Sequence, residues 1–258
     1  MSIKAVFFDI DGTLVSFKTH IMPQSTIDAL NKLQTAGIRI FIASGRHIST
    51  INNLGDQKFD GMITINGGMT IVDGKIIDEH TIPNNEIESI VDYMQTERNF
   101  PCCFVEDSGV YINHTNHDTD VIFDMINFPS PASVDMNNLT KARVYQLIAF
   151  FRPEEEPTIM RSLPNCRSAR WHELFTDIVP NNVSKVTGIE AIAKHYGFNR
   201  NEIATFGDGG NDIEMLQWAE MGIAMGNADE NVKNHARYVT TAIDDDGIWN
   251  AVNNWILK

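Results

Sequence analysis

Residues 3–13 read Ile-Lys-Ala-Val-Phe-Phe-Asp-Ile-Asp-Gly-Thr, an apolar run that ends directly in two aspartates. The run is rich in aromatic and β-branched residues, which predicts a buried strand over Ile3–Phe8. Side chains two positions apart on an extended segment point the same way, about 6.5 Å from each other, so Asp9 and Asp11 are expected to project together. Gly12 lets the chain turn sharply beside them. On its own the pattern fits a solvated turn as well as a pair of catalytic carboxylates.

The first and last parts of the chain alternate between strand and helix patterns. In the first part, strands are predicted at 38–43 and 61–65, and helices at 25–36 and 48–54. The alternation returns after residue 184, with predicted helices at 186–196, 212–218, 230–236 and 248–256 and strands at 203–206, 222–225 and 238–241. Such alternation predicts a parallel sheet with crossover helices.

The middle of the chain has a different pattern. An Asp-Gly pair at 73–74 lies between apolar runs and predicts a β-hairpin over 71–77. Strands then outnumber helices, with strands expected near 102–105, 110–113, 145–151, 167–171 and 176–179 and helices near 86–97, 120–126 and 153–161. We therefore expect an α/β fold, with a Rossmann-like parallel-sheet core of residues 1–81 plus 184–258 and an inserted α+β domain of residues 82–183.

Composition limits the classes of partner and the compartment. The 258 residues carry a net charge of −14, which disfavours nucleic acid and anionic membranes as partners. No apolar run approaches the ~20 residues of a membrane span, and the early aspartates do not fit a signal peptide. The three cysteines are an odd number, which fits a reducing compartment and predicts a cytoplasmic protein. We expect a monomer that acts on a small molecule.

Three further clusters follow predicted strands or begin predicted helices of the core. Ser44-Gly45-Arg46 follows the second strand, where a hydroxyl and free backbone N–H groups suit a phosphate. Lys185 begins a helix after Ser184, a suitable N-cap. The segment 207–212 reads Gly-Asp-Gly-Gly-Asn-Asp, a tight loop whose oxygen atoms suit Mg²⁺. Each cluster alone also fits an ordinary turn or surface residue. Ligands bind beyond the carboxyl ends of parallel strands, so we expect the clusters to meet there.

The order of the four clusters is more specific than any one of them. Asp-x-Asp-Gly-Thr at 9–13, Ser-Gly-Arg at 44–46, Lys185 and Gly-Asp-Gly-Gly-Asn-Asp at 207–212 together resemble the haloacid dehalogenase superfamily of phosphohydrolases. The chain is most similar to the Cof-type sugar-phosphatase branch, which carries an α+β cap, and within it to hexose-phosphate phosphatases of Bacteroides type. Asn-Gly-Gly at 66–68 also resembles a segment of that branch. The resemblance covers essentially the whole chain.

This resemblance implies a Mg²⁺-dependent phosphatase that forms an aspartyl-phosphate intermediate. It implies that Asp9 is the nucleophile and a metal ligand. Asp11 would protonate the leaving alcohol and later activate water, while its backbone carbonyl binds Mg²⁺. Asp208 would be the third metal ligand from the protein. Asp212 would orient the groups around the metal or Lys185.

The remaining site residues are expected to bind the phosphate group. The resemblance implies that Ser44 and the Gly45 N–H hold the transferring phosphoryl group and that Lys185 and Asn211 contact its oxygens. The charges support a metal independently of the resemblance. Four aspartates and a phosphate monoester bring a large excess of negative charge, which Lys185, Mg²⁺ and oriented N–H groups would offset.

Other functions remain open at this stage. A phosphomutase of the same superfamily would return phosphate to its substrate, and nothing in the sequence excludes this. A phospho-accepting signalling receiver uses an aspartate, acidic neighbours and a lysine, but it lacks the second aspartate two positions on, the loop at 207–212 and the long insertion. A protein that only binds ligand is disfavoured by Asp11. Arg170, Trp171 and Asp177 are candidates for cap residues that reach the substrate, whose sugar the sequence does not identify.

Overall fold

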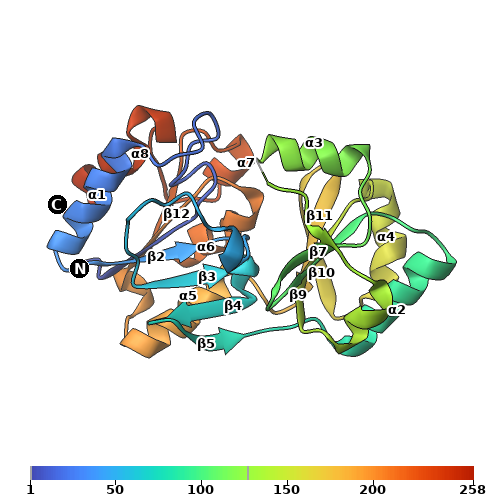
Figure 1. Cartoon of the computed structure of the whole chain (residues 1–258). Helices are drawn as coiled ribbons and strands as arrows, with labels where there is room; N and C mark the ends of the chain where they lie inside the picture. The colour runs from blue at the N-terminus through green and yellow to red at the C-terminus, as the bar shows by residue number, and fades with distance from the viewer. Residues whose placement is uncertain (1, 127) are drawn as a thin grey trace. The chain divides into compact units, whose positions relative to one another are not determined.

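The structure is a computed structural model that describes residues 2–126 and 128–258, and this part of the chain divides into two units (Figure 1). The first unit runs to Glu79 and resumes at Ser184, and the second runs from His80 to Val183. Each unit has hydrophobic clusters made only of its own residues. Among the described residues, no helix combines the length and the apolar character that crossing a membrane requires.

The first unit is built on an eight-stranded sheet of order β14-β13-β12-β1-β2-β3-β4-β5. Its strands are β1 (Ala5–Phe8), β2 (Arg39–Ala43), β3 (Gly61–Thr64), β4 (Met69–Val72), β5 (Lys75–Glu79), β12 (Ile203–Gly207), β13 (Met221–Ala224) and β14 (Tyr238–Val239). The strands from β14 to β3 run parallel, and β4 and β5 add an antiparallel hairpin at the edge. The predicted hairpin is confirmed, because Asp73 and Gly74 both have the positive φ (50° and 70°) of a type I′ turn.

Helices cover both faces of this sheet because its strands are apolar on both sides. Val6 and Phe8 face a cluster that includes α1 (Gln24–Thr35) and α8 (Gly247–Ala251). Ala5 and Phe7 face the opposite cluster, which includes α5 (Lys185–Tyr196) and residues of α6 (Ile213–Trp218). A short helix, α7 (Glu230–Lys233), packs against α6 and β13. The predicted α/β class and parallel-sheet core are confirmed.

The second unit is α+β. Its sheet has the order β10-β11-β9-β6-β7-β8 and is antiparallel except for the β7–β8 pair. The strands are β6 (Cys102–Glu106), β7 (Gly109–Ile112), β8 (Ala132–Ser133), β9 (Val144–Ala149), β10 (Cys166–His172) and β11 (Phe175–Pro180), and the helices are α2 (Asn84–Thr96), α3 (His117–Met125) and α4 (Glu156–Ile159). Residues of α2 and α4 pack in one cluster and residues of α3 in another.

Four predicted helices are shorter or less regular than expected. The helix predicted at 230–236 ends at Lys233. The helix predicted at 48–54 is only a 3₁₀ turn, Ile48–Thr50, because Arg46 takes the Thr50 carbonyl that a longer helix would use. The helix predicted at 153–161 is broken into 3₁₀ and α turns around Pro157, which has no N–H to donate. The last helix changes after Ala251 into a π turn, Val252–Ile256.

Candidate active site

The predicted site residues lie beyond the carboxyl ends of neighbouring parallel strands. Asp9 follows β1, Ser44 follows β2 and Asp208 follows β12, and β1 pairs with both β2 and β12. Lys185 is the first residue of α5, which the Ser184 side chain caps by accepting from the Val186 N–H. The clusters separated along the sequence are therefore brought to one edge of the sheet, as expected from its parallel order.

Lys185 joins two of the aspartates. Its Nζ lies 2.5 Å from Asp9 Oδ1 and 2.6 Å from Asp212 Oδ1, and only 1% of its side chain is exposed. Burial alone would lower the pKa of Lys185, but the carboxylates of Asp212 and Asp9 outweigh burial and leave the pKa above its ordinary value. The buried ammonium is therefore a permanent positive charge beside Asp9.

Asp212 uses its two oxygens for different partners. Oδ1 accepts from Lys185, and Oδ2 accepts the backbone N–H groups of Asp208 at 3.0 Å and Gly209 at 2.9 Å. The side chain is fully buried. Asp212 thus fixes both the lysine and the loop that carries Asp208, and it has little capacity left for a metal ion.

Asp208 lies against the turn that follows Asp9. Its Oδ1 accepts from Thr13 Oγ1 at 2.7 Å, and its Oδ2 accepts from Asn227 Nδ2 at 3.3 Å. Gly12 is the point of closest approach: its φ is 82°, and a Cβ there would lie 2.1 Å from Asp208 Oδ2. Only glycine lets the first and fourth motifs approach this closely. Asn227, which also donates to the Gly12 carbonyl at 2.9 Å, had no signal in the sequence.

The carboxylates are crowded beyond what one lysine can neutralise. Carboxylate oxygens of Asp9, Asp208 and Asp212 lie within 4.8 Å of one another. Burial first, then the charges of Asp212 and Asp11, raise the pKa of Asp9 to about 7 against the opposing effect of Lys185. Burial, Asp9 and Asp212 likewise raise the pKa of Asp208 to about 8. Both carboxylates would be ionised more readily with a cation beside them.

This donor set fits a divalent metal ion. Hard carboxylate oxygens are the ligands that Mg²⁺ prefers. Asp212 already accepts three hydrogen bonds, one from Lys185 and two from backbone N–H groups, whereas Asp9 accepts one from Lys185 and Asp208 accepts one at each oxygen. Asp9 and Asp208 are therefore the carboxylates with more capacity left to hold the ion.

Asp11 is bound by an arginine that the sequence analysis left without a role. Arg46 Nε donates to Asp11 Oδ2 at 2.7 Å, and Arg46 Nη2 donates to Asp11 Oδ1. The same guanidinium reaches the Thr50 carbonyl and Asn53 Oδ1, both at 3.2 Å through Nη1. The ion pair leaves 39% of the Asp11 side chain exposed, unlike buried Asp9. The two aspartates of the first motif therefore have different environments, since Asp9 is bonded to Lys185 and Asp11 to Arg46.

Ser44, Gly45 and Asn211 meet around a further asparagine. Asn211 Nδ2 donates to Asn66 Oδ1 at 3.0 Å, and the Asn66 amide lies against Gly45. Ser44 is buried, and its Oγ accepts from the Arg46 N–H at 3.1 Å. Asn66 belongs to the Asn-Gly-Gly segment noticed in the sequence, but nothing there pointed to a contact with Asn211.

Of the candidate specificity residues in the second unit, Arg170 has hydrogen-bond partners within that unit. Arg170 Nε donates to Glu156 Oε2 at 2.9 Å, and its Nη1 donates to the Phe175 carbonyl at 2.9 Å. Asp177 is buried, with 6% of its surface exposed. The side chain of Trp171 lies outside the described part of the chain. A substrate contact for these residues stays a prediction.

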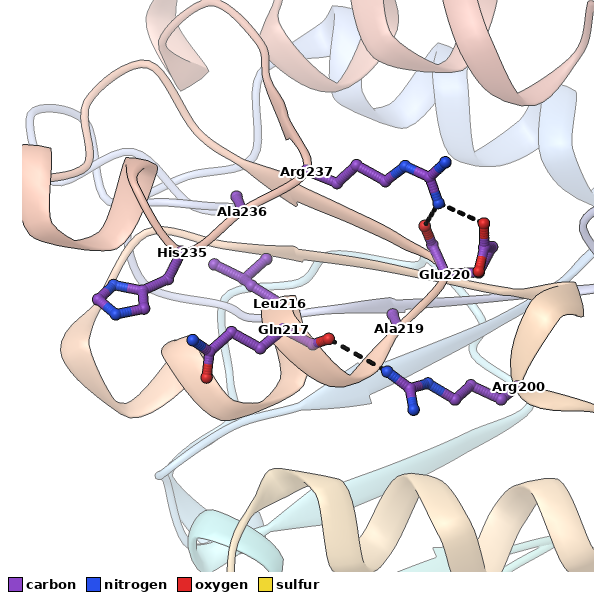
Figure 2. A pocket seen from close by; sticks show the side chains of 8 residues that line it. All are labelled: Arg200, Leu216, Gln217, Ala219, Glu220, His235, Ala236 and Arg237. Atoms are coloured by element: carbon purple, nitrogen blue, oxygen red, sulfur yellow. Dashed lines mark hydrogen bonds and ion pairs between the residues drawn. The ribbon is translucent and has the colours of Figure 1, made fainter.

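A surface pocket of about 410 Å³ lies at the opposite edge of the core sheet, where Arg200, Glu220 and Arg237 precede β12, β13 and β14 (Figure 2). Its charged groups are largely paired. Arg237 Nη1 donates to the Glu220 carbonyl at 3.1 Å and to its carboxylate, and Arg200 Nη2 donates to the Gln217 carbonyl at 3.3 Å. The pocket is separate from the carboxylate cluster.

Comparison with known proteins finds similar phosphatases among both sequences and solved structures. The candidate phosphatase YkrA of Bacillus subtilis is 31% identical over 254 residues, which cover 98% of this chain and 97% of YkrA. The solved structure of BT4131, described as a HAD subclass IIB sugar phosphatase, matches with a TM-score of 0.91 and 39% identity over 98% of each chain. BT1666, a phosphatase from Bacteroides thetaiotaomicron, matches with a TM-score of 0.90 and 36% identity over 98% of this chain and 94% of its own.

A family model agrees with these matches over nearly the whole sequence. The model describes haloacid dehalogenase-like hydrolases and matches residues 6–252, which cover all of the second unit, most of the first and all of the predicted site residues. The resemblance stated from the motifs is thereby confirmed, and this chain belongs to the haloacid dehalogenase-like hydrolases.

Proposed function

We propose that this hydrolase is a Mg²⁺-dependent phosphatase that removes phosphate from a sugar phosphate or a similar small metabolite through an aspartyl phosphate on Asp9. The observation that carries the proposal is the contact of buried Lys185 with Asp9, beside a second carboxylate on Asp208. The lysine supplies the local positive charge that a phosphate needs on a protein of net charge −14.

Asp9 performs the covalent step. A carboxylate oxygen of Asp9 attacks phosphorus, and the bond between phosphorus and the substrate alkoxide oxygen breaks. Asp11 first takes up a proton at one of the two oxygens that Arg46 binds in this structure. It gives that proton to the alkoxide oxygen, which leaves as an alcohol. Water then attacks the phosphorus of the aspartyl phosphate and gives a proton to Asp11, which releases inorganic phosphate and regenerates the Asp9 carboxylate.

The other residues bind and orient the phosphoryl group. The Lys185 ammonium and the Asn211 amide face its oxygens, and the Ser44 hydroxyl and the Gly45 N–H complete the set of donors. Asp9, Asp208 and the backbone carbonyl of Asp11 would hold Mg²⁺, and Asp212 would keep Lys185 and the loop of Asp208 in place. When bound, the ion neutralises the carboxylates and stabilises the transferring phosphoryl group.

The sugar-phosphate class is supported by relatives. BT4131 is described as a sugar phosphatase and is 39% identical to this chain over 98% of both. We propose that the inserted domain, residues 82–183, is a cap that determines which substrate is accepted. Three buried cysteines without disulfides support a reducing compartment, and we propose a cytoplasmic monomer.

A screen for phosphate release tests the proposal. Purified protein is assayed with sugar phosphates, polyol phosphates and nucleotides, with Mg²⁺ or with excess chelator. We expect turnover of at least one sugar phosphate, loss of turnover in chelator and recovery on adding Mg²⁺. Asp208→Asn should raise the Mg²⁺ concentration for half activity, because one anionic ligand is lost. Full activity in chelator would refute the metal role, and isomerisation without phosphate release would identify a mutase.

A further inference from the structure

The turn after β3 has an unusual backbone. Ile65, Asn66 and Gly67 have φ values of 55°, 52° and 98°, so three successive residues lie in the left-handed region. Glycine and asparagine adopt this region readily, but a β-branched residue such as isoleucine rarely does. Strain of this kind persists only where the surrounding structure enforces it, and it is concentrated at functional sites.

The turn is bonded to the Ser44-Gly45-Arg46 motif. The Asn66 N–H donates to the Ser44 carbonyl at 3.0 Å, and the Ile65 N–H donates to the Arg46 carbonyl at 3.0 Å. A Cβ on Gly45 would lie 3.1 Å from Asn66 Oδ1, so the absence of a side chain at 45 makes room for the Asn66 amide. The left-handed turn therefore places this amide directly beside the motif.

The turn also reaches the segments that carry Lys185 and Asn211. A Cβ on Gly67 would lie 2.0 Å from the carbonyl oxygen of Ser184, the residue that caps α5 ahead of Lys185. Asn66 Oδ1 accepts from Asn211 Nδ2 at 3.0 Å, and only 5% of Asn66 is exposed. One turn thus contacts the three segments that supply Ser44, Asn211 and Lys185.

We infer that Asn66 is a positioning residue for phosphate binding, an inference that rests on the phosphatase function proposed above. An asparagine amide can present either N–H donors or a carbonyl acceptor to a ligand. By accepting one N–H of Asn211, the oxygen of Asn66 fixes the Asn211 amide with its NH₂ group toward the site, and the second N–H is left for a phosphate oxygen. If the Asn211 amide were reversed, its oxygen would face the phosphate oxygens and repel them.

The test measures what Asn211 contributes when Asn66 is changed. Asn66→Gly removes the side chain but keeps the left-handed backbone, which glycine adopts without strain. Asn66→Asp keeps an acceptor oxygen for Asn211 and adds a negative charge. The effect of Asn211→Ala is then measured in three backgrounds, the native chain, Asn66→Gly and Asn66→Asp, so that the added charge cancels in each comparison.

Inorganic phosphate is the probe, titrated calorimetrically into the full-length Mg²⁺-loaded protein. In the native and Asn66→Asp backgrounds, Asn211→Ala should weaken phosphate binding about tenfold, the value of one hydrogen bond to a charged group. In the Asn66→Gly background, Asn211→Ala should weaken phosphate binding less than about twofold, because the Asn211 amide is already misplaced there. The Mg²⁺ affinity should stay the same in Asn66→Gly, since Asp9 is held by Lys185 and Asp208 by Thr13 and Asn227.

Several results would overturn the inference. One is an equal loss from Asn211→Ala in the native and Asn66→Gly backgrounds, and another is a native protein that binds no phosphate. If Asn66→Gly does not fold, the Asn66→Asp background decides, and loss of the Asn211 contribution there refutes the role. The titration requires no turnover. A protein that binds phosphate with this coupling but hydrolyses no ester would disprove the proposed function and leave the positioning role intact.

Discussion

Asp9 and Asp11 have the same functional group in different surroundings, which gives them different expected mutant phenotypes. Asp9 is buried against Lys185, whereas Asp11 is partly exposed and paired with Arg46. Asp9→Asn replaces the attacking carboxylate with an uncharged, weakly nucleophilic amide and should abolish turnover. Asp11→Asn removes only proton transfer, so turnover should fall roughly 10²–10⁴-fold, and phosphate should accumulate on Asp9. The measurements are burst kinetics with an aryl phosphate and mass spectrometry of the quenched protein.

The outcome that would contradict these roles is specific. Phosphate found on Asp11, or normal turnover by Asp9→Asn, would show that the nucleophile is assigned to the wrong residue.

A second prediction at the residue scale concerns Arg46 and its contact with Asp11. Because its guanidinium binds both oxygens of Asp11, Arg46→Lys keeps the charge but loses the paired geometry. We expect kcat for a sugar phosphate to fall about tenfold, since a misoriented Asp11 transfers its proton less well. An aryl phosphate, whose leaving group needs no proton, should be affected much less in the step that forms the phosphoenzyme.

Arg39→Lys is the matched control, because Arg39 forms an ion pair with Asp60 at 2.6 Å on the same sheet but away from the aspartates. It should leave the ratio of the two activities unchanged. An equal loss for both substrates in Arg46→Lys would mean that Arg46 does not act through Asp11.

Individual residues also show where sequence reasoning stops. Asp9, Asp208 and Lys185 could be predicted to lie together because each belongs to a short motif whose position after a strand or before a helix could be predicted. Arg46 was inside a motif, but its bond to Asp11 spans 35 positions. The contacts of Asn66 with Asn211 and of Asn227 with Gly12 span 145 and 215 positions, so they exist only in the folded chain.

At the scale of elements, the turn after β3 predicts that substituting two glycines will lower the stability of the protein by different amounts. Gly67 and Gly37 both have positive φ, at 98° and 77°. A Cβ on Gly37 meets nothing within 4 Å, whereas one on Gly67 would collide with the Ser184 carbonyl. Gly37→Ala should lower the free energy of unfolding by about 1–2 kcal/mol for the backbone alone. Gly67→Ala should lower it by about twice as much or more, because the backbone at Ser184 must move.

Urea unfolding of both variants measures the difference. Equal losses would show that the turn can move away from Ser184 freely, and would weaken the case for the turn as a rigid link between motifs.

Elements with strong periodic patterns were the most predictable. The parallel strands, the hairpin at Asp73-Gly74 and helix α5 with Gly197 after it lie close to where the sequence places them. The weak helices failed where a local side chain or a proline decided the outcome. At 48–54 the deciding partner was Arg46, and at 153–161 it was Pro157, which the periodicity of apolar residues does not record.

At the scale of the whole molecule, the chain can be divided at its two crossings. Each unit has its own hydrophobic clusters. The two ends to be joined lie near the same strand. Glu79 pairs with Met69 on β4, and Gly67, two residues before Met69, contacts Ser184. A short glycine linker from Glu79 to Ser184 should therefore give a folded first unit. It should still hydrolyse a small aryl phosphate, but its kcat/KM values for different sugar phosphates should become nearly equal, because the proposed cap is gone.

Circular dichroism checks the fold of the shortened chain, and a panel of sugar phosphates measures its selectivity. A folded first unit that keeps the selectivity of the full chain would show that the inserted residues do not choose the substrate.

The turn after β3 also bears on how the protein ages. Asn66 is followed by Gly67. In an Asn-Gly pair the glycine nitrogen attacks the side-chain carbonyl carbon, ammonia leaves as a cyclic imide forms, and water then opens the imide to aspartate or isoaspartate. That attack needs a mobile backbone and an accessible amide. In the folded chain Asn66 is buried and bonded to Asn211, so the reaction is suppressed. On heating or partial unfolding the dipeptide is released, and deamidation then leaves a carboxylate beside the phosphate site. This chemical damage would persist after refolding, so brief thermal stress leaves a lasting loss of phosphate affinity.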